Sequence, residues 1–105
     1  MIEILNENNF SAKTASGISI VDFYADWCGP CKMMVPILER VSEKAKARIC
    51  KVNVDDSREL AQRFGVKGIP FIVVLKDGKP VEQSVGLKDE KTILEMIDRH
   101  ANTQV

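Results

Sequence analysis

The sequence predicts a single α/β domain built on a mixed sheet, and three observations lead to this fold class. Apolar runs typical of buried strands alternate with helical patterns over the first two thirds of the chain. Asp77-Gly78 then predicts a tight hairpin between two further strands. A length of 105 residues suits one hydrophobic core and is too short for two. We therefore expect residues 1–105 to form one domain, with parallel strands joined by right-handed crossovers, an antiparallel pair, and helices on both faces.

The first part of the chain contains two strands and a helix. Ile2–Leu5 is a short strand, and Asn6–Ala15 is a weak helix that Gly17 ends. Ile18–Tyr24 is nearly continuous in apolar residues, as expected of a central strand covered on both faces. Only Asp22 interrupts this run strongly, so a carboxylate is expected in the interior.

The middle of the chain continues the alternation. A helical pattern runs from about Cys31 to Lys46 and contains Pro36, which should kink the helix. Ile49–Val54 is the next strand. Ser57 can cap a shorter helix, which Gly65 closes.

The last part predicts the antiparallel pair and a final helix. Phe71–Leu75 is fully apolar, and Lys79–Val85 follows the hairpin. Pro80 makes this last strand an edge strand, because proline cannot donate to a sheet ladder. Asp89 is a plausible cap for a helix with three inward-facing residues, Ile93, Leu94 and Ile97. The expected architecture is thus five strands and four helices.

Composition excludes several classes of partner. Fifteen basic and fifteen acidic residues give zero formal net charge, so we expect neither nucleic acid nor an anionic membrane as partner. The start of the sequence lacks the basic region and long apolar core of a signal peptide, and no apolar run approaches the ~20 residues that span a bilayer. The cytoplasm is the expected location, and a monomer the expected state.

The segment Trp-Cys-Gly-Pro-Cys at residues 27–31 lies where a strand gives way to a helix. Residues three apart share a helix face, so Cys28 and Cys31 can close a disulfide without refolding the chain. Thiolate is the attacking species, and unpaired N–H groups at a helix start favour it. We therefore assign Cys28 as nucleophile and Cys31 as the resolving thiol, with Pro30 in the first turn, where its missing N–H costs nothing.

A zinc site is the alternative reading of the same cysteines. Its other ligands would have to be Cys50 and His100, and one Cys-x-x-Cys pair is weak support for zinc. Cys50 is more simply a buried strand thiol. His100, near the end of the last helix, is more simply a partner of the helix dipole.

Asp22 is a candidate proton carrier. Burial would raise its pKa towards neutrality and let it accept a proton from Cys31. Lys51, on the neighbouring strand, is the expected charge partner. A structurally satisfied Asp22–Lys51 pair is an equally open interpretation.

Trp27 and Pro70 also have two interpretations each. Trp27 either shields the disulfide and touches substrate or covers the edge of the sheet. The base rate of cis X–Pro bonds, ~5–6%, favours a trans bond before Pro70.

The whole chain resembles the thioredoxin family in the order and spacing of its motifs. The resemblance is carried by these segments: Val21-Asp22-Phe23, Trp27-Cys28-Gly29-Pro30-Cys31-Lys32, Pro36, Lys51-Val52-Asn53-Val54-Asp55, Gly68-Ile69-Pro70, Asp77-Gly78 and Val85-Gly86. It implies the thioredoxin fold, a central mixed five-stranded sheet flanked by about four helices. Three positions depart from the commonest family pattern: Tyr24 in place of tryptophan, Phe71 in place of threonine, and the additional thiol Cys50.

The resemblance also implies the site and its partners. Cys28 is then the exposed nucleophile, Cys31 the resolving thiol, and Asp22 a buried acid/base beside Lys51. The bond before Pro70 is cis and faces the disulfide, the backbone of Ile69 pairs with substrate, and the Gly-Pro insert resembles that of reducing members. The docking surface implied is Trp27, Gly29, Pro30, Gly68, Ile69, Pro70 and Gly86.

The expected function is reduction of protein disulfides through the Cys28–Cys31 dithiol, with no bound cofactor. Neither a dinucleotide-binding glycine motif nor a P-loop is present, so electrons are expected from another protein. The resemblance implies that the protein supplying these electrons is thioredoxin reductase, an NADPH-dependent flavoprotein. A thioredoxin-fold binding subunit, using the apolar surface around Trp27, Ile69 and Gly86, is the alternative from another class.

Overall fold

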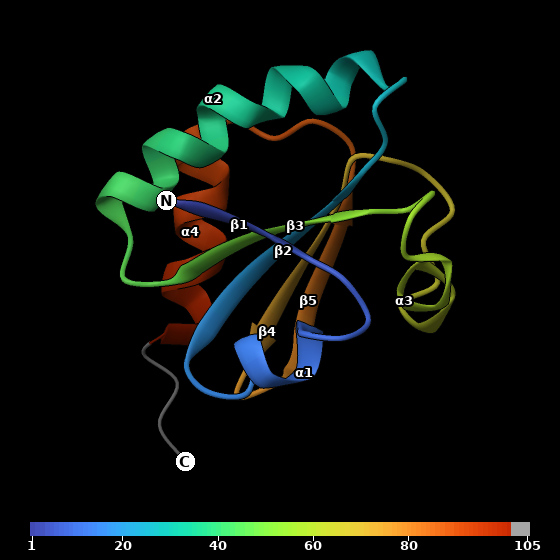
Figure 1. Cartoon of the computed structure of the whole chain (residues 1–105). Coiled ribbons are helices and arrows are strands. Elements are labelled where there is room, and N and C mark those ends of the chain that lie inside the picture. Colours follow the sequence, from blue (N-terminus) through green and yellow to red (C-terminus); the bar gives the residue numbers. More distant parts are fainter. Residues whose placement is uncertain (102–105) are drawn as a thin grey trace.

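A computed structural model describes residues 1–101 and contains a five-stranded mixed sheet with four helices (Figure 1). The strand order is β1-β3-β2-β4-β5, where β1, β3 and β2 are parallel and β4 is antiparallel to both of its neighbours, β2 and β5. The predicted fold class is therefore confirmed. The strands are β1 (Ile2–Leu5), β2 (Ile18–Tyr24), β3 (Arg48–Asn53), β4 (Phe71–Lys76) and β5 (Lys79–Val85). The helices are α1 (Phe10–Lys13), α2 (Gly29–Lys44), α3 (Arg58–Arg63) and α4 (Glu90–Ala101).

The central strand β2 contributes to two hydrophobic cores, one on each face of the sheet. Ile18 and Ile20 pack with residues of α2 and α4, whereas Val21 and Phe23 pack with residues of α1 and α3. Figure 1 shows the same division, with α2 and α4 on one side of the sheet and α1 and α3 on the other. Because side chains alternate between the faces of a strand, Asp22 lies on the face that α2 and α4 cover.

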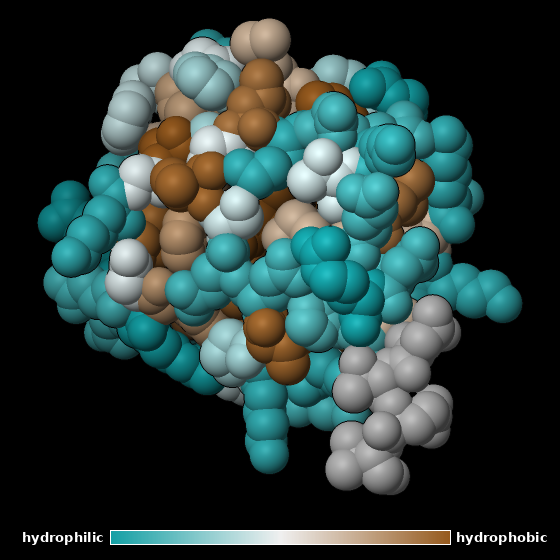
Figure 2. All heavy atoms as spheres, turned by 180° about the vertical axis from the view of Figure 1, so that it is seen from behind, coloured by the Kyte–Doolittle hydropathy of each residue, from teal (hydrophilic) through white to brown (hydrophobic). Residues whose placement is uncertain are grey.

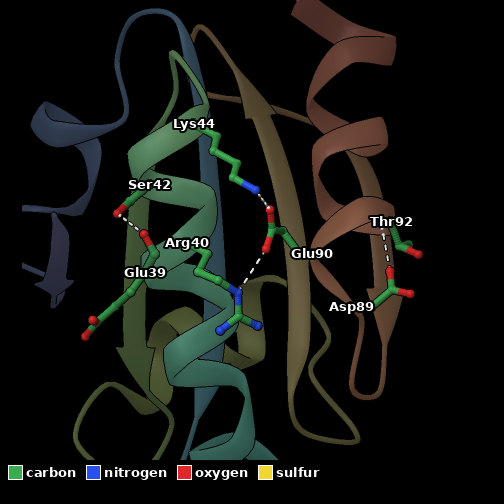
Figure 3. Close-up of polar contacts among 7 residues, drawn as sticks. All are labelled: Glu39, Arg40, Ser42, Lys44, Asp89, Glu90 and Thr92. Atoms are coloured by element: carbon green, nitrogen blue, oxygen red, sulfur yellow. Dashed lines mark hydrogen bonds and ion pairs between the residues drawn. The ribbon is translucent and has the colours of Figure 1, made fainter.

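Helices α2 and α4 are joined at the surface by Glu90 (Figure 3). Its carboxylate accepts from Arg40 Nε at 2.9 Å and pairs with Lys44. Exposed ion pairs of this kind add little to stability, because water and salt screen the charges. The expected cap of α4 is confirmed, since the Thr92 N–H donates to Asp89 Oδ1 at 2.8 Å. Of its expected inward residues, Ile93 and Ile97 are buried and Leu94 is half-buried; Met96 is buried as well.

The first helix is shorter than the expected Asn6–Ala15. The Asn6 N–H donates to Asn9 Oδ1 at 2.8 Å, and the Asn8 N–H donates to Asn6 Oδ1 at 2.9 Å. Asparagine side chains that bind nearby backbone groups compete with the helix, so α1 begins only at Phe10.

The bounds of α2 and the capping of α3 also differ from expectation. Helix α2 begins at Gly29 and ends at Lys44, with Pro36 inside it. Ser57 does occupy the N-cap of α3, but its side chain makes no capping hydrogen bond. A carboxylate oxygen of Glu7 accepts from the Leu60 N–H at 3.3 Å instead, a cap supplied from the loop before α1.

The hairpin and the edge strand follow the prediction. Asp77 and Gly78 both have positive φ angles, 51° and 82°, as a type I′ turn requires. Pro80 lies on β5, which forms one edge of the sheet. Among residues 1–101, none of the helices has the length and apolar character needed to cross a membrane.

Candidate active site

The two cysteines lie where β2 ends and α2 begins. Cys28 is the N-cap residue of α2, and Pro30 lies in its first turn. The Cys31 N–H donates to Cys28 Sγ at 3.2 Å, so the sulfur occupies the position of a capping oxygen. The sulfurs form a disulfide with the two Cα atoms 5.2 Å apart. The predicted placement of both thiols within one helical turn is confirmed.

The disulfide is more enclosed than the resemblance implied. Cys28 is 5% exposed and Cys31 is 1% exposed, so both are buried. The expectation of an exposed Cys28 is wrong for this closed form, because Ala25, Tyr24, Val54 and Ile69 pack around the pair.

The loop before β4 approaches Cys28 from the other side. The Ile69-Pro70 bond is cis, so the expectation from base rates is wrong and that from the family is confirmed. The Ile69 carbonyl oxygen lies 3.9 Å from Cys28 Sγ. The Gly86 N–H donates to the Pro70 carbonyl oxygen at 2.8 Å, which joins this loop to the end of β5. At Gly68 a Cβ would lie only 3.1 Å from a methyl group of Val85, so the two segments pack closely there.

Trp27 is 71% exposed beside the cysteines. Its indole N–H donates to Asp55 Oδ2 at 3.0 Å, and a side chain this exposed covers little of the sheet edge. Other exposed apolar side chains are Met33 on α2, Val85 at the end of β5, and Leu87 just after it. Figure 2 shows apolar side chains gathered at the upper left of the rear face, the end of the molecule where α2 begins. The contact with Asp55 was not predicted, although Asp55 belongs to a motif that the sequence singles out.

Asp22 is fully buried on β2, opposite Lys51 in the register of β2 and β3. Neither carboxylate oxygen has a hydrogen-bond partner among residues 1–101. Burial raises the pKa of Asp22 from 3.8 to about 7, and the Lys51 ammonium opposes part of this rise. The Lys51 ammonium instead lies 4.0 Å from the centre of the Tyr24 ring. The two residues therefore do not form the satisfied ion pair that was one of the two open interpretations.

A surface hollow of about 310 Å³ opens beside two of these groups. It is lined by Tyr24, Ala25, Asp26, Cys31, Lys32, Val35 and Lys51. Cys31 and Lys51 thus share one opening, and Asp22, whose pKa is strongly raised, is the register partner of Lys51. Such clustering is typical of functional sites.

The ligands required by the zinc alternative lie apart. Cys50 is buried among apolar residues on the α1 and α3 face, where burial raises the pKa of its thiol to about 12. His100 Nε2 lies 2.8 Å from Glu82 Oε1 on β5, so its side chain has a specific partner besides the helix dipole. No group of three metal-ligating side chains occurs in the part of the chain described by the structure.

A pair of thiols that cap a helix and close into a disulfide is the working group of a thiol–disulfide oxidoreductase, and this is the class to which the site belongs. The family is equally clear from comparison with known proteins. The family model named Thioredoxin matches residues 1–99, and the chain belongs to the thioredoxin family.

Individual relatives match over nearly the whole chain. A thioredoxin of Chlamydia muridarum (strain MoPn / Nigg) is 46% identical over 101 residues, which cover 95% of this chain and 99% of that protein. A thioredoxin of Bacillus subtilis (strain 168) is 44% identical over 96 residues, covering 90% and 92%. The solved structure of a mutant thioredoxin from Halobacterium salinarum NRC-1 superposes with a TM-score of 0.92 at 33% identity, covering 99% of this chain and 94% of that chain.

Proposed function

We propose that this oxidoreductase reduces disulfide bonds in other proteins, with Cys28 as the attacking thiolate. The observation that carries the proposal is the position of Cys28 Sγ, which accepts the Cys31 N–H at the start of α2. A backbone donor and the positive end of the helix dipole stabilise a sulfur anion, so the thiolate forms more readily than in a free cysteine.

The reaction proceeds in two exchanges. The Cys28 thiolate attacks one sulfur of the substrate disulfide, forms a mixed disulfide, and expels the other substrate sulfur as a thiolate that takes up a proton. The Cys31 thiolate then attacks Cys28 Sγ, forms the Cys28–Cys31 bond and expels the second substrate sulfur, which is protonated in turn. The substrate gains two electrons and two protons, and the protein loses them.

We assign Asp22 as the acceptor of the Cys31 proton and Lys51 as its charge partner. A carboxyl group with a pKa of about 7 exchanges protons readily at neutral pH, and its acidity matches that task. The hollow that Cys31 and Lys51 line offers a path by which water reaches this part of the site.

The substrate is expected to lie as an extended segment across the loops that meet at Cys28. The Ile69 backbone beside Cys28 Sγ supports this placement. The exposed indole of Trp27 offers an apolar contact next to it. The proposed docking residues are Trp27, Gly29, Pro30, Gly68, Ile69, Pro70 and Gly86.

The oxidised protein then needs two electrons from a second protein, since its own working group is the Cys28–Cys31 pair. We propose thioredoxin reductase, a flavoprotein that takes these electrons from NADPH. We further propose that residues 1–105 act as a single monomeric domain in the cytoplasm and bind no cofactor, nucleic acid or membrane.

The test is a coupled assay with insulin as the disulfide substrate, NADPH and thioredoxin reductase. NADPH should be consumed only when this protein is present, and two free thiols should appear on insulin for each NADPH consumed. Absence of turnover with several reductases, together with no reduction of insulin by the protein pre-reduced with dithiothreitol, would refute the proposal.

The exposed apolar surface favours a second candidate, a binding subunit that needs no turnover. Trp27 and Met33 are 71% and 60% exposed. The double variant Cys28→Ser, Cys31→Ser separates the candidates: it should lose function in cells if the thiols act, and keep it if only the surface is needed.

A further inference from the structure

The Tyr24 ring contacts the ammonium group of Lys51, the charged group that acts on Asp22. Tyr24 and Asp22 are two positions apart on β2 and share a face of the sheet. The Lys51 Nζ atom lies 4.0 Å from the centre of the Tyr24 ring, a distance at which the ring attracts a cation. Tyr24 is also one of the positions at which this chain departs from the commonest family pattern.

The remaining surroundings of Asp22 contain little charge that could replace Lys51. On β4 its partner in register is the apolar Ile72, and α4 presents Ile93, Met96 and Ile97 to the core on this face. From α2 and the turn before it come Cys31, closed in the disulfide, and Lys32 and Asp26, which line the outer hollow. Among these groups and Lys51, the Lys51 ammonium is the charge whose attraction lowers the pKa of Asp22 and so opposes the effect of burial.

The Tyr24 ring is itself fixed in place. Its phenol interacts with the side chain of Asn53, and this interaction opposes part of the rise that burial causes in the pKa of Tyr24. The Asn53 side chain accepts from the backbone N–H groups of Asp55 and Asp56 at 2.8 and 3.2 Å, which holds that amide in one orientation. The ring therefore offers the lysine a defined position and does not merely follow it.

We propose that Tyr24 is a positioning residue: its ring keeps the Lys51 ammonium at the hollow beside Cys31, and from there the ammonium sets the proton affinity of Asp22. The functional meaning of this inference rests on the proposed role of Asp22 as proton acceptor. The electrostatic relationship itself does not depend on that role.

The direction of the effect follows from the solvation of lysine. An ammonium group is strongly hydrated, and moving it into contact with the buried carboxyl would cost desolvation. Without the ring, Lys51 therefore extends into solvent, its attraction for the Asp22 carboxylate weakens, and the pKa of Asp22 rises.

The test is titration of Asp22 by carbon-13 NMR of its carboxyl group in the oxidised protein, with the signal assigned by its loss in Asp22→Asn. Tyr24→Leu should raise the pKa of Asp22 by about half a unit to one unit. Tyr24→Ile, whose branched side chain suits a strand, serves as a second variant and should do the same. Tyr24→Phe keeps the ring but loses the phenol that contacts Asn53, so it should raise the pKa of Asp22 less than Tyr24→Leu does.

A double-mutant cycle shows whether the effect runs through the lysine. Lys51→Met should raise the pKa of Asp22 at least as much as Tyr24→Leu, and adding Tyr24→Leu to Lys51→Met should raise it no further. An unchanged or lowered pKa in both Tyr24→Leu and Tyr24→Ile would overturn the inference. So would full additivity in the cycle, because the ring would then act on Asp22 without the lysine.

The pH profile of disulfide reduction separates this inference from the proposed function. Ionisation of the Cys28 thiol gives one step of the acidic limb in every variant that keeps this residue. If Asp22 accepts the proton, a second step should move to higher pH in Tyr24→Leu by the same amount as the NMR titration, and this step should be absent in Asp22→Asn. A profile with the same steps in Asp22→Asn as in the wild type refutes the proton role of Asp22, while the NMR titrations still decide the role of Tyr24.

Discussion

Asp22 and Lys51 face each other on neighbouring parallel strands, yet the carboxylate makes no hydrogen bond within residues 1–101, and the ammonium rests on the ring of Tyr24. A buried carboxylate without such partners is costly in its charged form. The native state therefore holds a proton on Asp22 more tightly than the unfolded chain does, and the pKa rises from 3.8 to about 7.

The first prediction concerns stability against pH. Because the pKa is raised in the folded protein, the contribution of Asp22 to stability is fully present below about pH 3.8 and is lost as pH rises to about 7. Asp22→Asn removes the charge and should raise the free energy of unfolding at pH 8 by about 2–4 kcal/mol. Guanidinium denaturation of the oxidised proteins measures this difference.

The same experiment at pH 4 is the internal control, because there the two proteins should differ much less. Asp98→Asn, at an exposed position on α4, is the matched control and should show no comparable gain at pH 8. A gain of equal size at both pH values would mean that the amide simply packs better and that ionisation of Asp22 is not the cause.

The order of strands and helices could be predicted because each pattern is local. The nearly continuous apolar run of β2, the positive φ angles of Asp77-Gly78 and the capping role of Asp89 all follow from neighbouring residues. The length of α1 could not be predicted in this way. Its start depends on asparagine side chains that bind the backbone of the preceding turn, and helix propensity does not report that competition.

The second prediction concerns the division of labour between the cysteines. In Cys31→Ser the hydroxyl cannot displace substrate, so a mixed disulfide should accumulate on Cys28. Mass spectrometry after thiol alkylation, without reduction, should find the adduct on that residue. Cys28→Ser should give no comparable adduct, because Cys31 is only 1% exposed. Trapping in Cys28→Ser alone would reverse the assignment.

The third prediction concerns the exposed indole. Trp27→Ala should raise the KM for a protein disulfide about tenfold, with a smaller change in kcat, because an exposed tryptophan contributes to docking more than to bond exchange. Asp55→Ala, which removes the acceptor of the indole N–H, should give a smaller rise because the ring remains but loses its orientation.

Val81→Ala is the matched control for Trp27→Ala. Val81 is also exposed and apolar, but it lies near the start of β5, next to the hairpin and away from the cysteines. Its KM should equal that of the wild type. An equal rise in Val81→Ala and Trp27→Ala would place substrate elsewhere.

The cysteine pair was the part of the site most accessible to prediction, because both thiols lie within four consecutive residues. The contacts of Trp27 with Asp55 and of Lys51 with Tyr24 join separate strands and loops, and they depend on side-chain directions that periodicity does not specify. His100 shows the same limit. Its position near the end of α4 indicated a dipole interaction, whereas its closest partner, Glu82, comes from β5.

The last prediction concerns Gly68, where the loop before β4 meets the end of β5. A Cβ at this position would lie 3.1 Å from Val85 Cγ2, closer than a relaxed contact allows. Gly68→Ala should therefore destabilise the protein by about 1 kcal/mol. It should also lower kcat/KM, because it displaces the loop whose Ile69 carbonyl lies beside Cys28.

Val85→Ala provides the rescue, since it removes the methyl group that the new Cβ meets. The double variant Gly68→Ala, Val85→Ala should recover the stability and kcat/KM of Val85→Ala alone. Gly29→Ala is the control for stability, because a Cβ at Gly29 meets nothing within 4 Å and should cause no loss. If Gly68→Ala is as stable and active as the wild type, the Val85 side chain, which is 57% exposed, turns away freely, and the close approach at Gly68 does not constrain the loop.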